Sequence, residues 1–104
     1  MVDDIELVVV TMVFDAADPV QVNGLLSKYV VLTRGHAGCR NVDLLASATK
    51  PGTYLVISKW ESAEAQRAHF DSPDMVELAE GCRGILSRPP QIDLYDAVSA
   101  HDLH

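Results

Sequence analysis

The sequence predicts a single α+β domain whose strands and helices follow the order β-α-β-β-α-β. Three observations support this prediction. The chain begins with a run rich in β-branched residues. At two places a cap residue followed by proline predicts the start of a helix. A proline-glycine turn separates two apolar stretches. The length of 104 residues suits one domain. We expect its core to span residues 5–98, with a polar tail at residues 99–104.

The first half of the chain predicts two strands with a helix between them. Residues 5–14 (IELVVVTMVF) are almost wholly apolar, which is typical of a strand covered on both faces. Asp18 followed by Pro19 predicts the cap and first turn of a helix that runs to about Arg34. Residues 39–47 predict the second strand. The apolar positions at helical spacing are Val22, Leu25, Leu26, Tyr29 and Thr33.

The second half predicts a hairpin, two short helices and a last strand. Residues 53–60 (TYLVISKW) form the third strand, joined to the second by the Lys50-Pro51-Gly52 turn. Ser62 caps a short helix over residues 63–71, and Ser72-Pro73 begins another. Residues 91–98 form the fourth strand. The apolar positions of the later helix are Met75, Leu78, Ala79, Cys82, Ile85 and Leu86, before Pro89-Pro90 ends it.

This order of elements is the ferredoxin-like split arrangement, a four-stranded antiparallel sheet with helices on one face. The first strand is apolar on both sides, so the open face of the sheet is expected to meet a partner. We therefore predict a homodimer in which two sheets pack face to face. Val10 and Met12 are assigned to the partner face, and Thr11 to the helix-covered face.

Composition and charge exclude several classes of function. The net charge is −7, with 15 acidic and 8 basic residues and no basic cluster, which argues against nucleic-acid binding. No apolar run approaches the ~20 residues that span a bilayer, and the acidic start does not resemble a signal peptide. Two distant cysteines, Cys39 and Cys82, suit a reducing compartment. We expect a soluble, cytoplasmic protein without a membrane partner.

The most informative stretch is residues 59–73 (KWESAEAQRAHFDSP), where a strand ends on the single Trp and turns into a short helix bearing His69. Together with Gly38-Cys39 and Tyr54-Leu55-Val56, this pattern resembles the antibiotic biosynthesis monooxygenase domain family over about residues 5–98. The resemblance implies a dimeric α/β barrel with a pocket in each subunit, between the sheet and the helices.

Several members of that family oxidise quinols or polyketide anthrones with molecular oxygen and without metal or flavin. The resemblance therefore implies a cofactor-independent monooxygenase acting on a small planar phenol, quinol or enolisable aromatic molecule. His69 would be the base and Trp60 the stacking group. No cofactor and no metal site are expected, because His36, His101 and His104 are scattered in the sequence. The expected pocket walls are Thr11, Tyr54, Val56, Ser58, Phe70, Met75 and Leu78.

Two other functions stay open. The polyketide-oxidising members carry an Asn and a Tyr where this chain has Val56 and Gln66, which favours a non-catalytic dimeric protein that binds a small apolar ligand. Trp60 and His69 would then be ordinary core residues. Haem degradation ranks last. The Asn, Trp and His that form the site of the haem-degrading members correspond to Thr11, His69 and Leu78 here, so the haem-binding histidine is missing.

Overall fold

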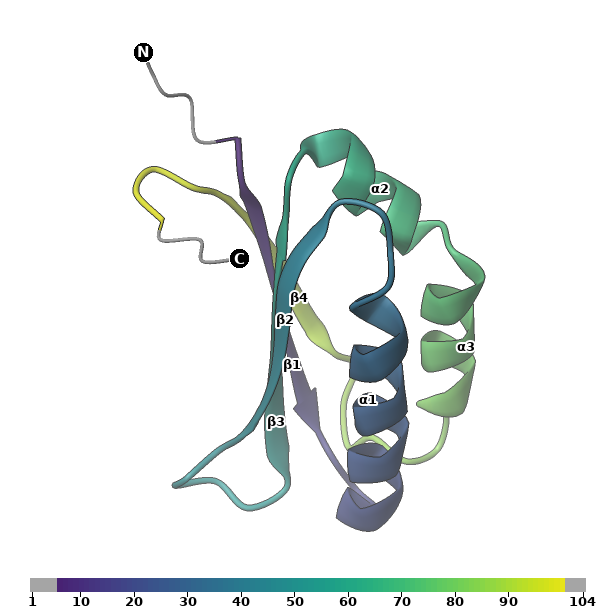
Figure 1. Cartoon of the computed structure of the whole chain (residues 1–104). Coiled ribbons are helices and arrows are strands. Elements are labelled where there is room, and N and C mark those ends of the chain that lie inside the picture. The colour runs from purple at the N-terminus through teal and green to yellow at the C-terminus, as the bar shows by residue number, and fades with distance from the viewer. Residues whose placement is uncertain (1–5, 101–104) are drawn as a thin grey trace.

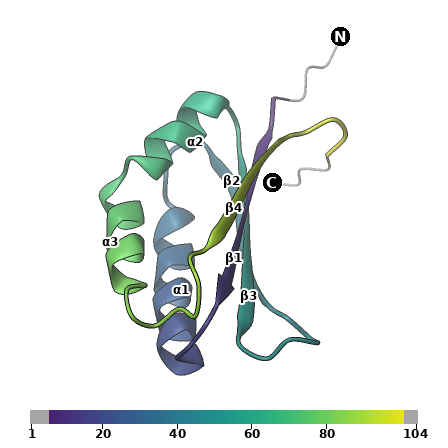
Figure 2. The ribbon, with the colours of Figure 1, turned by 180° about the vertical axis from the view of Figure 1, so that it is seen from behind.

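The computed structural model describes residues 6–100, which form one sheet layer and one helical layer (Figure 1). The strands are β1 (Val8–Asp15), β2 (Cys39–Ala46), β3 (Thr53–Trp60) and β4 (Gln91–Asp96). The helices are α1 (Pro19–Thr33), α2 (Ala63–Phe70) and α3 (Pro73–Gly81). All strand pairs are antiparallel, in the order β2-β3-β1-β4. The three helices lie on one side of the sheet (Figure 2). The predicted ferredoxin-like arrangement is confirmed.

Side-chain caps start each helix where the sequence predicts. Asp18 accepts a hydrogen bond from the Gln21 amide at 3.2 Å. Ser62 accepts one from Ala65 at 3.1 Å, and Ser72 accepts one from the Met75 amide at 3.3 Å. Each cap satisfies one of the donors that a helix leaves free in its first turn. Because Ser72 and Pro73 fix the start of α3, the next two residues, Asp74 and Met75, lie in its first turn.

The third helix ends earlier than its apolar spacing predicts. It stops at Gly81, and Gly84 takes a left-handed conformation with φ of 80°. Ile85 then accepts hydrogen bonds from the amides of Ala17 and Asp18, while Leu86 forms an isolated bridge with Ala16. Both side chains still pack against the core, so their spacing reflects burial rather than helix. The fourth strand likewise ends at Asp96 instead of Val98, and Ile5 lies outside the described residues.

The two faces of β1 are the reverse of the sequence assignment. Val10 and Met12 are 1% exposed and pack beneath the helices. Thr11, which alternates with them, points to the open face and pairs with Ile57 of β3. A strand that is apolar on both sides gives no internal sign of which side meets the helices. Val10 and Met12 therefore form core, not partner surface.

Candidate active site

Trp60 and His69 lie together at one end of the helical layer. Trp60 is the last residue of β3, and His69 is in the last turn of α2. Their rings are stacked, with centroids 4.7 Å apart and planes inclined by 28°. The indole N–H of Trp60 donates to Ser58 Oγ at 2.9 Å. Trp60 thus forms one flat wall against His69, while its own donor is already satisfied by β3.

Both ring nitrogens of His69 have hydrogen-bond partners within the chain. Nε2 lies 2.5 Å from the hydroxyl of Tyr29 on α1, and Nδ1 lies 3.1 Å from Nδ1 of His36. His36 Nε2 in turn lies 2.7 Å from Asp74 Oδ2 on α3. A continuous series of hydrogen bonds therefore joins three helices and the loop after α1. We call it the histidine chain, made of Tyr29, His69, His36 and Asp74.

The loop between α1 and β2 holds His36 against α2. The His36 amide donates to Thr33 O at 3.0 Å, and its carbonyl accepts from Cys39 at 3.1 Å. Gly38 has φ of 81°, and a Cβ there would lie 2.4 Å from Ala65 Cβ. Only glycine allows this close approach of the loop to α2. The Gly38 carbonyl also accepts from the Glu61 amide at 2.9 Å, which fixes the loop to the start of the helical segment.

Burial keeps the inner members of the histidine chain uncharged. Burial, followed by the charge of His36, lowers the pKa of His69 to about 4. Burial raises the pKa of Tyr29 to about 12. At neutral pH the pair is therefore a neutral imidazole and a neutral phenol. His69 is 2% exposed and Tyr29 is 4% exposed, whereas the side chains of His36 and Asp74 are 21% and 29% exposed.

A cavity of about 260 Å³ lies between α3 and the sheet, on the helix-covered face. Its walls are almost wholly apolar, and burial raises the pKa of the one thiol among them, Cys82. Met75 connects the cavity to the histidine chain, because its sulfur lies 3.6 Å from the Tyr29 hydroxyl. The lining residues are Met12, Phe14, Met75, Leu78, Ala79, Cys82, Pro90 and Ile92. Such a space suits a small apolar molecule.

The structure brings together some of the residues that the sequence predicts for the pocket. Met75 and Leu78 line the cavity. Phe70 is half-buried, with its ring centroid 6.2 Å from that of His69. Tyr54, Val56 and Ser58 share the helix-covered face with Trp60, as the two-residue period predicts, but they do not line this cavity. Thr11 lies on the opposite face of the sheet and is separated from all of them.

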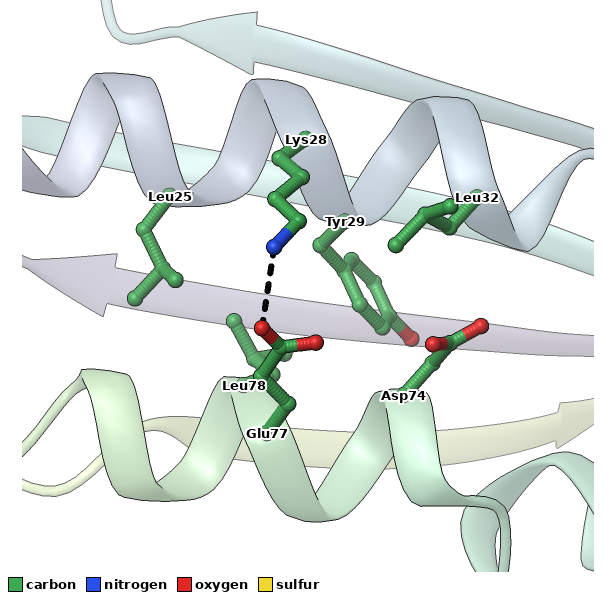
Figure 3. A pocket seen from close by; sticks show the side chains of 7 residues that line it. All are labelled: Leu25, Lys28, Tyr29, Leu32, Asp74, Glu77 and Leu78. Carbon is green, nitrogen blue, oxygen red and sulfur yellow. Dashed lines mark hydrogen bonds and ion pairs between the residues drawn. The ribbon is translucent and has the colours of Figure 1, made fainter.

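A second, much smaller hollow lies between α1 and α3. Figure 3 shows Tyr29 reaching from α1 toward α3, with the ion pair of Lys28 and Glu77 beside it. Asp74 also lines this hollow, whose volume of about 10 Å³ is no larger than the space one water molecule needs. It is an indentation of the surface next to the histidine chain rather than a place for a substrate.

Two features are absent from the described part of the chain. Within residues 6–100, no three His, Cys, Asp or Glu side chains converge in a way that would hold a metal ion. No helix in this range has the length and apolar character needed to cross a membrane.

Three members of the histidine chain were not predicted as site residues. Tyr29 reads as a core position of an amphipathic helix, and His36 reads as one of several scattered histidines. Asp74 reads as an ordinary acidic residue in a first helical turn. The available signal was weak. The two glycines of the Gly35-His36-Ala37-Gly38 segment predict a tight turn. Only the fold shows that this turn brings His36 into contact with His69.

Comparison with solved structures supports the fold over nearly the whole chain. Rv0793 from Mycobacterium tuberculosis is 25% identical, with a TM-score of 0.81 over 90% of this chain and 97% of that chain. NE2512 from Nitrosomonas europaea is 16% identical, with a TM-score of 0.85 over 98% and 99%. SnoaB from Streptomyces nogalater, a cofactor-independent oxygenase, is 18% identical, with a TM-score of 0.80 over 91% and 96%.

Comparison with proteins of curated function finds no significant match. The family model for antibiotic biosynthesis monooxygenases matches residues 9–81, from β1 to the end of α3. That range includes the whole histidine chain and leaves out only β4 among the secondary-structure elements. The match covers most of the sequence, and the protein therefore belongs to the antibiotic biosynthesis monooxygenase family.

Proposed function

We propose that the protein is a cofactor-independent oxygenase of a small planar phenol, quinol or enolisable aromatic compound. The observation that carries this proposal is the position of the Tyr29–His69 pair. A neutral phenol hydrogen-bonded to a neutral imidazole lies directly behind Met75, which walls an apolar cavity. The structural likeness to SnoaB, itself a cofactor-independent oxygenase, agrees with this chemistry.

In the proposed reaction the substrate supplies all the electrons. Removal of a proton from an enolisable CH₂ group raises the electron density on that carbon, which then reacts with O₂. One oxygen atom stays on the carbon as a carbonyl, and the other leaves as water together with the two hydrogens. The bonds made are C=O and the two O–H bonds of water, and the bonds broken are the two C–H bonds and O–O. An apolar cavity favours these steps by excluding bulk water.

Four of the predicted residues have a defined part in this proposal. Trp60 holds the His69 ring in place by stacking, and His69 accepts the hydrogen bond of Tyr29. The substrate occupies the cavity against Leu78. Met75 is unbranched and flexible, so a change of its rotamer brings the substrate into contact with the Tyr29 hydroxyl. His69 thus acts as a base through Tyr29 rather than by direct contact.

The first test is oxygen consumption with a panel of anthrones and quinols, without added metal or flavin. Wild type should consume oxygen with at least one member of the panel. Tyr29→Phe should lower kcat about 10²-fold or more, the usual contribution of a positioned acid or base. Tyr95→Phe makes the same change at an exposed position of β4 and should leave the rate unchanged. No uptake by wild type with any panel member would count against oxygenation.

A second candidate function is binding of an apolar ligand without turnover. The nearly complete absence of polar groups from the cavity wall favours it. Apart from Cys82, no side chain of the wall offers a group that would take part in a reaction with the ligand. Calorimetry with 1-naphthol under nitrogen separates the two functions. Binding that Ala79→Phe abolishes by filling the cavity, together with no oxygen uptake from the panel, would establish a binding protein.

The homodimer is part of the same proposal. The open face of the sheet carries half-buried apolar side chains from both central strands, among them Val9 and Val13 of β1 and Ile57 of β3. A second copy packed on this face would remove them from water and form the dimeric α/β barrel that the family resemblance implies. Sedimentation of the purified chain measures whether the dimer forms.

A further inference from the structure

The hydrogen bonds of the histidine chain restrict where its protons can lie. The carboxylate of Asp74 only accepts, so His36 Nε2 carries a proton and donates it. When His36 is neutral, its Nδ1 is an acceptor, and the proton in the 3.1 Å contact belongs to His69 Nδ1. His69 Nε2 is then an acceptor and receives the hydroxyl proton of Tyr29. Every donor faces an acceptor in this first arrangement.

A second arrangement exists when His36 binds another proton. Its Nδ1 now donates, so His69 Nδ1 must accept, and the proton of His69 moves to Nε2. His69 Nε2 donates to the Tyr29 oxygen, and the hydroxyl proton turns to the sulfur of Met75. His69 is neutral in both arrangements. The two states differ by one proton on His36 and by reversal of the inner hydrogen bonds.

We propose that the histidine chain is a proton relay that accepts a proton at Tyr29 and releases it from His36. This deepens the proposed function, on which its substrate end rests. Tyr29 is the group that meets the substrate, whereas His36 and Asp74 act through other residues and are positioning residues. The relay runs from the apolar cavity at Met75 to the partly exposed side chains of His36 and Asp74.

The transfer balances as a series of coupled proton movements. Tyr29 takes a proton from the substrate carbon or oxygen and passes its own to His69 Nε2. His69 passes the proton on Nδ1 to Nδ1 of His36. His36 becomes an imidazolium paired with the Asp74 carboxylate and later loses a proton to water. The substrate is left as an anion, and no charge rests on the buried imidazole or phenol.

This relay explains how a weakly basic imidazole serves at neutral pH. Because the pKa of His69 is about 4, it would not hold a proton taken from the substrate. In the relay, His69 accepts one proton on Nε2 while it gives another from Nδ1 to His36. The positive charge therefore forms on His36, beside the carboxylate of Asp74. The titratable and charged groups around the histidine chain include Asp74 and Glu77 from α3, Lys28 from α1 and Cys39 from β2.

The tautomer of His69 tests the relay without any enzyme assay. Imidazole ¹⁵N chemical shifts of the whole protein distinguish a protonated ring nitrogen from an unprotonated one. At alkaline pH, His69 should carry its proton on Nδ1. On acidification, once the ¹⁵N shifts of His36 show that both of its ring nitrogens are protonated, the proton of His69 should lie on Nε2. A His69 tautomer that stays fixed while His36 titrates would overturn the relay.

A pair of variants shows whether Asp74 holds the charge. Asp74→Asn keeps an acceptor for His36 Nε2 but removes the negative charge, so the change of tautomer at His69 should shift to lower pH. Glu80→Gln removes one charge from an exposed residue farther along the same helix and should leave the midpoint near that of wild type. Equal midpoints in Asp74→Asn and wild type would contradict the relay.

Activity then separates the relay from the function it serves. If oxygen uptake is found, Asp74→Asn should lower kcat with little change in KM and move the acidic limb of the pH profile in the same direction as the NMR midpoint. A tautomer switch without oxygen uptake supports the relay and rejects the proposed oxygenase. Oxygen uptake whose pH profile is the same in Asp74→Asn and wild type supports the oxygenase and overturns the relay.

Discussion

The two faces of the central strands β1 and β3 have similar apolar sequences but opposite surroundings. On the helix-covered face, Val10, Val56 and Trp60 are at most 1% exposed. On the other face their neighbours, such as Val9 and Ile57, are only half-buried. The buried polar side chains Ser58, Gln66 and His69 all lie in the helical layer or against it. The comparison teaches that the buried polar side chains gather on the helix-covered face, where we propose the chemistry, while the open face offers the apolar surface of the proposed dimer.

The strongest way to break this comparison is a charge on the helix-covered face. Val56 is fully buried in the core, so Val56→Asp would bury a carboxylate without a partner. We expect a loss of more than about 4 kcal/mol in the free energy of unfolding, enough to abolish folding of a small domain. Circular dichroism and urea unfolding measure it. A folded Val56→Asp protein of near wild-type stability would mean that the faces are misassigned.

A second prediction concerns the pH dependence of stability, which the buried His69 on the helix-covered side should produce. Its pKa is lowered to about 4 in the folded protein, below the ~6.5 of an exposed histidine, so the unfolded chain binds the proton more readily. The contribution of His69 to the free energy of unfolding is therefore fully present above about pH 6.5 and is lost as the pH falls toward about 4. The loss is on the order of 3 kcal/mol.

Urea midpoints measured between these pH values should fall less steeply in His69→Gln than in wild type. Parallel slopes in the two proteins would show that some other group, such as a carboxylate, dominates the acid sensitivity.

A pair of glycines gives a smaller effect within the helix-covered half. Gly38→Ala places a Cβ against Ala65 at a positive φ and should cost about 1–3 kcal/mol of unfolding free energy. Gly24→Ala is the matched control. Gly24 lies in the interior of α1, and a Cβ there would meet no atom within 4 Å apart from the adjacent helix backbone. The change should therefore stabilise the protein by about 0.5–1 kcal/mol. Thermal unfolding compares them, and equal melting temperatures would contradict the close approach of the loop to α2.

The smallest effect on folding is expected from a charge on the open face. Leu55 is next to Val56 on β3 but points away from the helices. Leu55→Asp should change the free energy of unfolding of the single chain by less than about 1 kcal/mol, as surface substitutions commonly do. It should instead convert the proposed dimer to monomer. Sedimentation of wild type and Leu55→Asp measures this change, and an undisturbed dimer would place the subunit contact elsewhere.

The sequence was sufficient for the fold because its signals are local. Caps such as Asp18 and Ser72, the Lys50-Pro51-Gly52 turn and the β-branched strands each act within a few residues. The side of β1 that meets the helices was predicted wrongly, since both sides of that strand are apolar. The helix expected to reach Leu86 ends at Gly81. The prediction was too long because residues beyond Gly81 are apolar at helical spacing for the sake of burial, without a helical backbone.

The candidate site was less predictable than the fold. His69 and Trp60 stand in a recognisable motif, and the structure brings their rings together. Tyr29 and His36 join them across 40 and 33 residues of sequence, through contacts that exist only after α1 and α2 have packed. No local pattern encodes such a contact. Residues of this kind are found from tertiary structure, or from the knowledge that a loop glycine such as Gly38 forces a close approach.

The weak attachment of β4 has a consequence for access to the cavity. Among residues 6–100, β4 pairs only with β1. Every residue of β4 is exposed in the single chain, and residue 91 lies 78 positions after residue 13, its partner. Strands with few buried contacts open first in native-state hydrogen exchange. Ile92 of β4 and the preceding Pro90, which line the cavity, therefore belong to a weakly buried wall. We expect amide exchange in β4 to be the fastest among the strands, and molecules to enter by fraying of this edge while the helices stay closed.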